Sequence, residues 1–293
     1  MTAMDRRWSK IYGAAACSIL LSTTAQADGP KATPPTEATI VAETVATGAV
    51  ATGAVATGAV ATGAVAPEPD LSGTWYLRMR TATNAKIPFL GNTYVRSTTH
   101  LLVRIENRPD GLYQSQQTCI VDTRPSRNIT KTVLPEAFVA HLAQKTYPIS
   151  VTKTEDGAWS YDADLQQQFV GYHGHLAPDG IPKNAKHPAV YDWDEDGKPG
   201  ASVLVDIPII GHIRIYLVQT NHTFLKGSID GPDDISGKTT QGLLGQRTIG
   251  ADNRLLAASP NLSIGTGHDA FEMIRIATGS SCQDIKRLAK DSF

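Results

Sequence analysis

Short segments of alternating apolar and polar residues occupy most of the chain after residue 70. In TWYLRM, for example, Trp75, Leu77 and Met79 fall on one face of an extended segment, and the alternation recurs in THLLVRIE, YPISVTK and GHIRIYLVQ. A period of two is that of a strand with one buried face. The intervening Asn-Arg-Pro-Asp-Gly and Gly-Pro-Asp-Asp sequences form turns. The pattern predicts an all-β fold, an antiparallel barrel or sandwich of about ten strands.

Only two segments have helical character. LPEAFVAHLAQ, residues 134–144, predicts one short internal helix, and SCQDIKRLAK, residues 281–290, predicts a C-terminal helix. Residues 70–293 are long enough to build one domain with a sizeable core. We therefore expect a single β-rich domain over 70–293.

The first predicted strand begins LSGTWYL and resembles the Gly-x-Trp strand of the calycin barrels, the lipocalins and avidins. Gly73 and Trp75 are the matching positions. In lipocalins the Trp plugs the closed end of the barrel and a late Arg packs over it, so the resemblance implies that role for Arg275 in MIRIA. The resemblance covers these few positions, because a second lipocalin motif of the Thr-Asp-Tyr kind is missing and the domain is longer than a lipocalin. The alternative is a buried core Trp of another β-fold.

The first 27 residues have the anatomy of a signal peptide. The basic segment DRRWSK precedes an apolar stretch, IYGAAACSILL, and the small-residue sequence AQA follows. A membrane anchor would need roughly 20 apolar residues, so we expect no transmembrane segment after cleavage. Residues 1–27 therefore predict export, to the periplasm, the outer membrane or the extracellular space.

Residues 28–69 predict a disordered linker. The segment is rich in Ala, Thr, Val, Gly, Pro and Glu, and residues 46–65 are four copies of ATGAV. A repeat of five fits neither helix nor strand, and its small side chains cannot build a core. The alternative is a small repeat structure, which normally needs a longer unit.

Two cysteines remain after the signal peptide, Cys119 and Cys282. In an oxidising compartment such a pair predicts one disulfide bond. The alternative is two buried free thiols.

The segment VYDWDEDGKPG carries three aspartates at every second position before a glycine. Asp192, Asp194 and Asp196 take positions 1, 3 and 5 of an Asp-x-Asp-x-Asp-Gly calcium loop, and the backbone carbonyl of Lys198 takes position 7. The stretch resembles the loops of EF-hands and dockerins, but Val203 stands where an EF-hand has a bidentate Glu. Asp206 is the expected replacement ligand. We predict a structural calcium that braces the loop over 177–200; the alternative is a solvated polar turn.

Three histidines form a second candidate metal site. His173 and His175 are two residues apart, so on a strand their rings would face one way, and His187 could add a third ligand. Solvent-facing histidines are the alternative interpretation.

The formal net charge of −1 and the absence of a basic run exclude a nucleic-acid-binding protein. No Gly-x-Ser-x-Gly or phosphate-binding glycine loop is present. We expect an exported binding protein for a small apolar ligand or a protein partner rather than an enzyme. A metal-assisted hydrolase that uses the three histidines, and a cell-surface structural or adhesion protein, remain alternatives. The oligomeric state is open.

Overall fold

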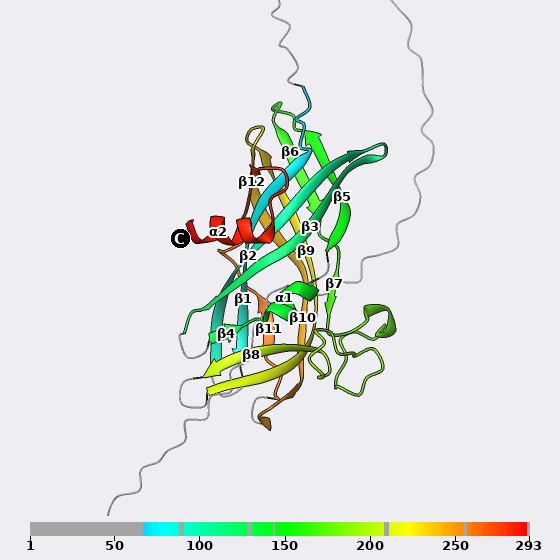
Figure 1. Ribbon diagram of the computed structural model, residues 1–293, viewed down its shortest axis with the longest axis vertical. Coiled ribbons are helices and arrows are strands. Elements are labelled where there is room, and N and C mark those ends of the chain that lie inside the picture. Colours follow the sequence, from blue (N-terminus) through cyan, green and yellow to red (C-terminus); the bar gives the residue numbers. More distant parts are fainter. Residues whose placement is uncertain are drawn as a thin grey trace, which may run out of the picture. The chain divides into compact units, whose positions relative to one another are not determined.

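The computed structural model describes residues 67–87, 91–127, 131–142, 144–207, 211–254 and 257–291 (Figure 1). The predicted signal peptide lies outside these residues, and so does the predicted linker apart from its last three residues. The described residues form twelve strands in one antiparallel sheet, with two α-helices. The predicted all-β class is therefore confirmed.

Eight strands form a closed ring. In ring order they are β10 (Asp234–Ala251), β12 (Phe271–Ile276), β1 (Gly73–Ile87), β2 (Gly91–Arg108), β3 (Gly111–Pro125), β5 (Lys145–Lys153), β6 (Trp159–Asp164) and β9 (Gly211–Ile229). Pairing of β9 with β10 along most of their length closes the ring. Of the two predicted architectures, the structure is a barrel.

Four short strands extend the ring at the end where β1 finishes and β9 begins. They are β4 (Lys131–Val133), β7 (Gln168–Val170), β8 (Ala201–Ile207) and β11 (Asn261–Ile264). β8 pairs with the first part of β9, and β4 pairs with β8. β7 pairs with the middle of β9, and β11 pairs with the last part of β1.

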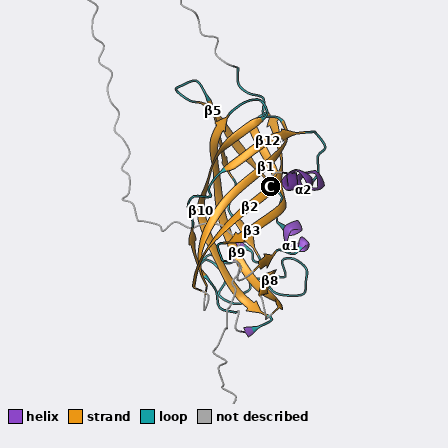
Figure 2. Cartoon of the chain, turned by 90° about the vertical axis from the view of Figure 1, so that its left-hand side faces the viewer, coloured by secondary structure: helices purple, strands orange, loops and turns teal. Residues whose placement is uncertain are grey.

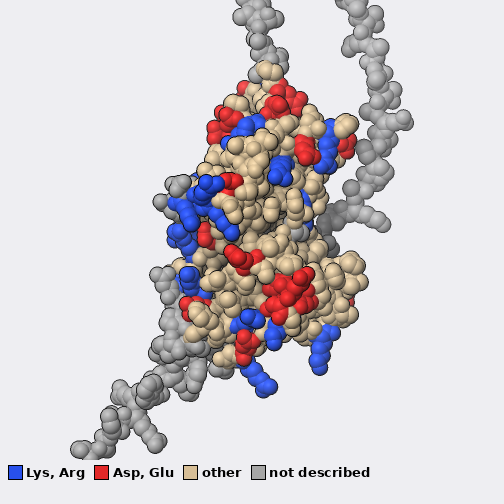
Figure 3. Space-filling model, in the orientation of Figure 1, with Lys and Arg blue, Asp and Glu red and all other residues tan. Residues whose placement is uncertain are grey.

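Both predicted helices are present and lie on one flank outside the barrel (Figure 2). α1 (Glu136–His141) contacts β3 and β8, and α2 (Cys282–Asp291) contacts β2 and β3. α2 buries Ile285 completely against Tyr76, Leu102 and Cys119 on the outer wall. On the face shown in Figure 3, Lys and Arg side chains gather at the level of α2 and acidic side chains form separate patches.

The barrel interior changes chemistry along its axis. One half, here called the closed half, is filled by large apolar side chains, among them Trp75, Leu77, Val103, Tyr161 and Phe271, each at most 1% exposed. Burial of this size is the main favourable term in folding. The closed half therefore holds the largest apolar cluster of the described residues.

The other half of the interior, here called the polar half, holds buried hydroxyl and amide side chains. Thr81, Ser97, Gln219, Asn221 and Thr223 are each at most 3% exposed. β1, β2 and β9 run through both halves, so the inward-facing positions of each strand change from apolar to polar along its length.

Candidate functional site

A cavity of about 70 Å³ lies in the polar half. Its walls are inward-facing residues of β1, β2, β3, β7 and β9, because strand alternation points every second side chain into the barrel. The buried polar residues of its lining are Thr81, Ser97, Gln116, Gln219, Asn221 and Thr223. Among the described residues that line it, none carries a charge. The cavity is therefore polar but uncharged.

Three oxygen atoms of this lining have no hydrogen-bond partner within the protein: Ser97 Oγ, Gln219 Oε1 and Thr223 Oγ1. The side chains that carry them are between 1% and 3% exposed. A buried polar atom without a partner costs about 1–3 kcal/mol. Such atoms around one cavity need a partner that enters it, either water or a ligand.

A hydrogen-bonded network of two tyrosines and two glutamines runs from the closed half to this cavity. Tyr161 donates to Gln114 Oε1, Gln114 Nε2 donates to Tyr147 Oη at 2.8 Å, and Tyr147 donates to Gln116 Oε1 at 2.7 Å. Burial raises the pKa of Tyr147 well above its ordinary value, so its hydroxyl remains a donor. The network fixes the amide of Gln116, which lines the cavity.

Helix α1 contacts β3 and β8 and lies beside the cavity. β3 pairs with β5 only over Tyr113–Gln116, and the described part of β3 beyond Gln116 has no partner on that side. Leu134, Phe138 and Leu142, on α1 and its flanks, close the cavity there. Phe138 is 1% exposed, so α1 is seated firmly.

The acidic segment forms a tight cluster next to α1. Asp192, Asp194 and Asp196 each bring one carboxylate oxygen within 4.8 Å of the others. Asp192 accepts hydrogen bonds from the backbone N–H groups of Asp196 and Gly197, at 3.1 and 2.8 Å. Gly197 has a φ of +80°, which lets the chain fold back over the carboxylates. The alternating aspartates thus converge, and the cluster can hold a metal ion.

Asp194 is the buried member of the cluster. It is 4% exposed, and its Oδ2 accepts a hydrogen bond from the Ser202 N–H at 2.9 Å, whereas its Oδ1 has no partner in the protein. Burial raises the pKa of Asp194, and the neighbouring carboxylates of Asp196 and Asp192 add to that rise. A buried carboxylate oxygen among like charges is the position at which a cation is most stabilising.

The other predicted calcium ligands lie differently. Asp206 falls outside the cluster, because it lies four residues beyond Ser202 on β8, where it pairs with Lys131 and approaches His212 Nδ1 at 3.7 Å. Lys198 is near the cluster and donates its backbone N–H to Asp196 Oδ1 at 3.0 Å. The structure does not place Asp206 in the cluster, and its role as the replacement for the EF-hand Glu stays a prediction.

Between the acidic cluster and the cavity stands Trp193. Its ring packs edge-on against Phe138, with centroids 5.0 Å apart, and lies 5.8 Å from the ring of His141. Because Phe138 lines the cavity, the acidic loop holds α1 over the cavity through this contact.

His173 and His175, two of the three candidate histidine ligands, do not lie on a strand as predicted. The chain leaves the sheet at Gly171, which has a φ of +77°, and His173 and His175 fall in and beside a 3-10 helix (Gly174–Leu176). His173 stacks on Tyr191 at 4.2 Å, and His187 Nδ1 accepts a hydrogen bond from the Ala189 N–H at 3.1 Å. Among the described residues, the three do not form a metal-ligand group.

At the closed end, the structure places the three residues of the Gly-x-Trp resemblance together. The Arg275 guanidinium lies over the Trp75 ring at 4.3 Å and donates to the carbonyl oxygens of Asp70 and Ser72. A Cβ on Gly73 would stand 2.7 Å from Arg275 Nη1. Trp75 Nε1 in turn donates to the Leu71 carbonyl at 2.9 Å. This end is closed by packing and hydrogen bonds, opposite the cavity.

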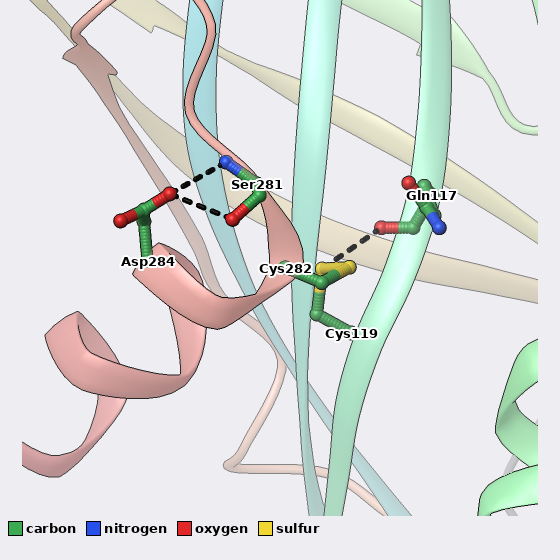
Figure 4. The surroundings of a disulfide bond; sticks show 5 residues. All are labelled: Gln117, Cys119, Ser281, Cys282 and Asp284. Carbon is green, nitrogen blue, oxygen red and sulfur yellow. Dashed lines mark hydrogen bonds between the residues drawn. A yellow bond between two sulfur atoms is a disulfide. The ribbon is translucent and has the colours of Figure 1, made fainter.

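The predicted disulfide joins Cys119 of β3 to Cys282 of α2 (Figure 4). Asp284 accepts hydrogen bonds from the backbone N–H and the hydroxyl of Ser281, which caps the helix N-terminus. The capped and cross-linked helix is thereby fixed to the outer wall.

The sequence analysis did not single out the cavity residues. A signal is present in LVQTNHTFL, where the inward positions run Leu217, Gln219, Asn221, Thr223 and Leu225. Polar residues in the middle of an otherwise apolar inward face indicate a polar pocket rather than a continuous core.

Fold and cavity together define a closed antiparallel barrel with an internal polar site. Compared with known proteins, the chain matches no protein-family model, no curated protein and no solved structure. Among the described residues, no helix has the length and apolar character needed to cross a membrane.

Proposed function

We propose that this protein is an exported binding protein that encloses a small, neutral, polar molecule in the polar half of its barrel. The observation that carries this proposal is the set of unpartnered buried oxygens of Ser97, Gln219 and Thr223 around one cavity. A site with fixed hydrogen-bonding groups selects ligands that satisfy them and rejects analogues that do not.

The lining favours a polar ligand over the apolar one that the sequence analysis expected. Hydroxyl and amide groups would be left unpaired by a hydrocarbon, at a cost of about 1–3 kcal/mol each. At 10–15 Å³ per water, a cavity of about 70 Å³ has room for roughly five water molecules. A short polyol or a small amide has the right size and chemistry.

Export is part of the same proposal. It rests on the signal-peptide sequence over residues 1–27 and on the disulfide, since disulfides form in oxidising compartments. The contact of Arg275 with Trp75 is what a lipocalin-like barrel would have at its closed end, and it supports a calycin-like binding role.

A titration with a panel of small polyols and amides, followed by calorimetry, tests the ligand proposal. Thr223→Val should weaken binding roughly tenfold, because it removes one hydrogen-bonding partner of the ligand. Thr83→Val is the matched control: Thr83 is also fully buried with an unpartnered hydroxyl, but it does not line the cavity. Equal affinities of the two variants for every ligand would contradict the proposal.

We also propose that the acidic cluster binds calcium, as a brace for α1. The unpartnered Oδ1 of Asp194, 4% exposed, points to a missing cation, and aspartate oxygens are the ligands that calcium prefers. An incomplete ligand set is typical of extracellular modules with dissociation constants of roughly 0.1–1 mM. Bound calcium would steady Trp193 and, through Phe138, the wall of the cavity.

Thermal melting with calcium and with chelator tests the proposed calcium site. Calcium should raise the melting temperature of the wild type and leave that of Asp194→Asn unchanged. Asp206→Asn removes a carboxylate outside the cluster and should respond as the wild type does. A wild-type protein that melts identically in calcium and chelator would disprove the calcium site.

A further inference from the structure

A second pocket, of about 260 Å³, lies on the outside of the barrel and is lined mainly by arginines. Arg78 and Arg80 come from β1, Arg96 from β2 and Arg124 from β3, and Thr98 and His268 complete the wall together with Asp122. Outward positions on three neighbouring strands converge there, so the pocket belongs to the rigid sheet rather than to a loop. It is separate from the cavity inside the barrel.

The charges in this pocket are unbalanced. Four guanidinium groups stand near three carboxylates: Glu272 accepts from both Arg78 and Arg80, Asp122 lies 3.5 Å from His100 Nε2, and Asp269 acts on His268. Arg96 also stands directly across from Arg124 in the β2–β3 pairing. Like charges directly opposite each other on neighbouring strands are destabilising.

His268 is affected by the positive charge of the same arginines. Burial lowers the pKa of its imidazole, and the charges of Arg80 and Arg96 lower it further, more than Asp269 raises it. A neutral imidazole and the Thr98 hydroxyl can both donate a hydrogen bond to an anion in the pocket.

We infer that this pocket binds a small oxyanion of the phosphate type, either inorganic phosphate or a phosphomonoester group. Planar guanidinium groups bind phosphate oxygens in pairs, and four arginines on one pocket wall favour an anion. The volume is below the roughly 300–1,000 Å³ of pockets for drug-sized ligands, which suits a small anion. A bound dianion would also offset the repulsion between Arg96 and Arg124.

Calorimetry with sodium phosphate at neutral pH, against sodium chloride of equal ionic strength, tests this inference. Arg96→Gln should weaken phosphate binding roughly tenfold, because it removes one charge-assisted contact. Arg104→Gln is the matched control, since Arg104 is an exposed arginine on the same outer face of β2 but does not line the pocket. That control should bind phosphate as the wild type does.

A variant that is expected to strengthen phosphate binding distinguishes an effect on the site from a loss of folding. Glu272→Gln removes the carboxylate that engages Arg78 and Arg80, so it should strengthen phosphate binding roughly tenfold. Vesicles that contain phosphatidic acid distinguish a lipid headgroup from free phosphate: an Arg96-dependent response to either probe supports the site. Two outcomes would overturn the inference. The first is phosphate binding no tighter than chloride binding together with vesicle binding that does not depend on Arg96. The second is an equal loss of phosphate binding in Arg96→Gln and Arg104→Gln.

Discussion

The closed half and the polar half of the barrel are built on the same strands, yet they have opposite energetics. Around Trp75 the interior is large, apolar and tied down by Arg275. Around Gln219 the interior is polar, contains a cavity and leaves buried oxygens unpaired. The difference indicates that one half provides stability and the other uses part of that stability to keep a polar cavity.

The largest effect should come from the closed half. Trp75→Ala removes a fully buried indole that packs on Leu71 and Arg275, and it should lower the free energy of unfolding by about 3–5 kcal/mol. Urea unfolding followed by far-ultraviolet circular dichroism measures this loss. A loss below about 1 kcal/mol would mean that the closed half is not the stabilising one.

Gly73→Ala should be the next largest change, at about 2–4 kcal/mol. Gly73 has a φ of +141°, and the new Cβ would also clash with Arg275. Gly111→Ala is the matched control, because Gly111 has a φ of +137° but nothing within 4 Å of the added Cβ. The difference between the two in thermal denaturation isolates the contact with Arg275, and no difference would show that this contact is unimportant.

Two threonines of β9 allow a hydrogen-bonded hydroxyl to be compared with a hydroxyl that has no partner in the protein. Thr220 Oγ1 donates to the Gln168 carbonyl at 2.9 Å, so Thr220→Val should cost about 1–3 kcal/mol. Thr223 Oγ1 has no protein partner, so Thr223→Val should leave stability unchanged or raise it slightly. Equal destabilisation in urea unfolding would mean that the hydroxyl of Thr223 is paired after all, and the polar half would lose its defining property.

The smallest effect should come from pH, through His100. This side chain is 0% exposed, is hydrogen-bonded to Tyr76 and has a pKa that burial lowers despite the nearby Asp122. Below about pH 6.5 the unfolded chain therefore binds more protons, and the free energy of unfolding should fall as pH falls through the folded-state value. His100→Gln should reduce this dependence of stability on pH in thermal melts from neutral to acidic pH. An unchanged dependence would show that other groups cause it.

Much of the closed half could be predicted from sequence, because it depends on local regularities. The alternation around Trp75 predicts the strand, and two cysteines in a chain that is expected to be exported predict their pairing. The two helices were likewise visible in their apolar periodicity.

The polar half could not be predicted to the same degree, because it depends on what distant segments bring together. Ser97 and Thr223 are ordinary polar residues until the closed ring turns both inward. The extended chain that begins at Trp159 also breaks, at Gln166 with a φ of +55° and at Gly171, where a Cβ would meet the Leu217 carbonyl at 2.6 Å. That break displaces the histidines and frees the chain to form the acidic loop.

The position of β12 sets when the molecule can fold. This strand is inserted between β10 and β1, so it joins the earliest strand of the ring to a late one. A nascent chain that ends before residue 271 therefore has both of those edges exposed and no closed wall. Ring closure must therefore wait until β12 has been synthesised.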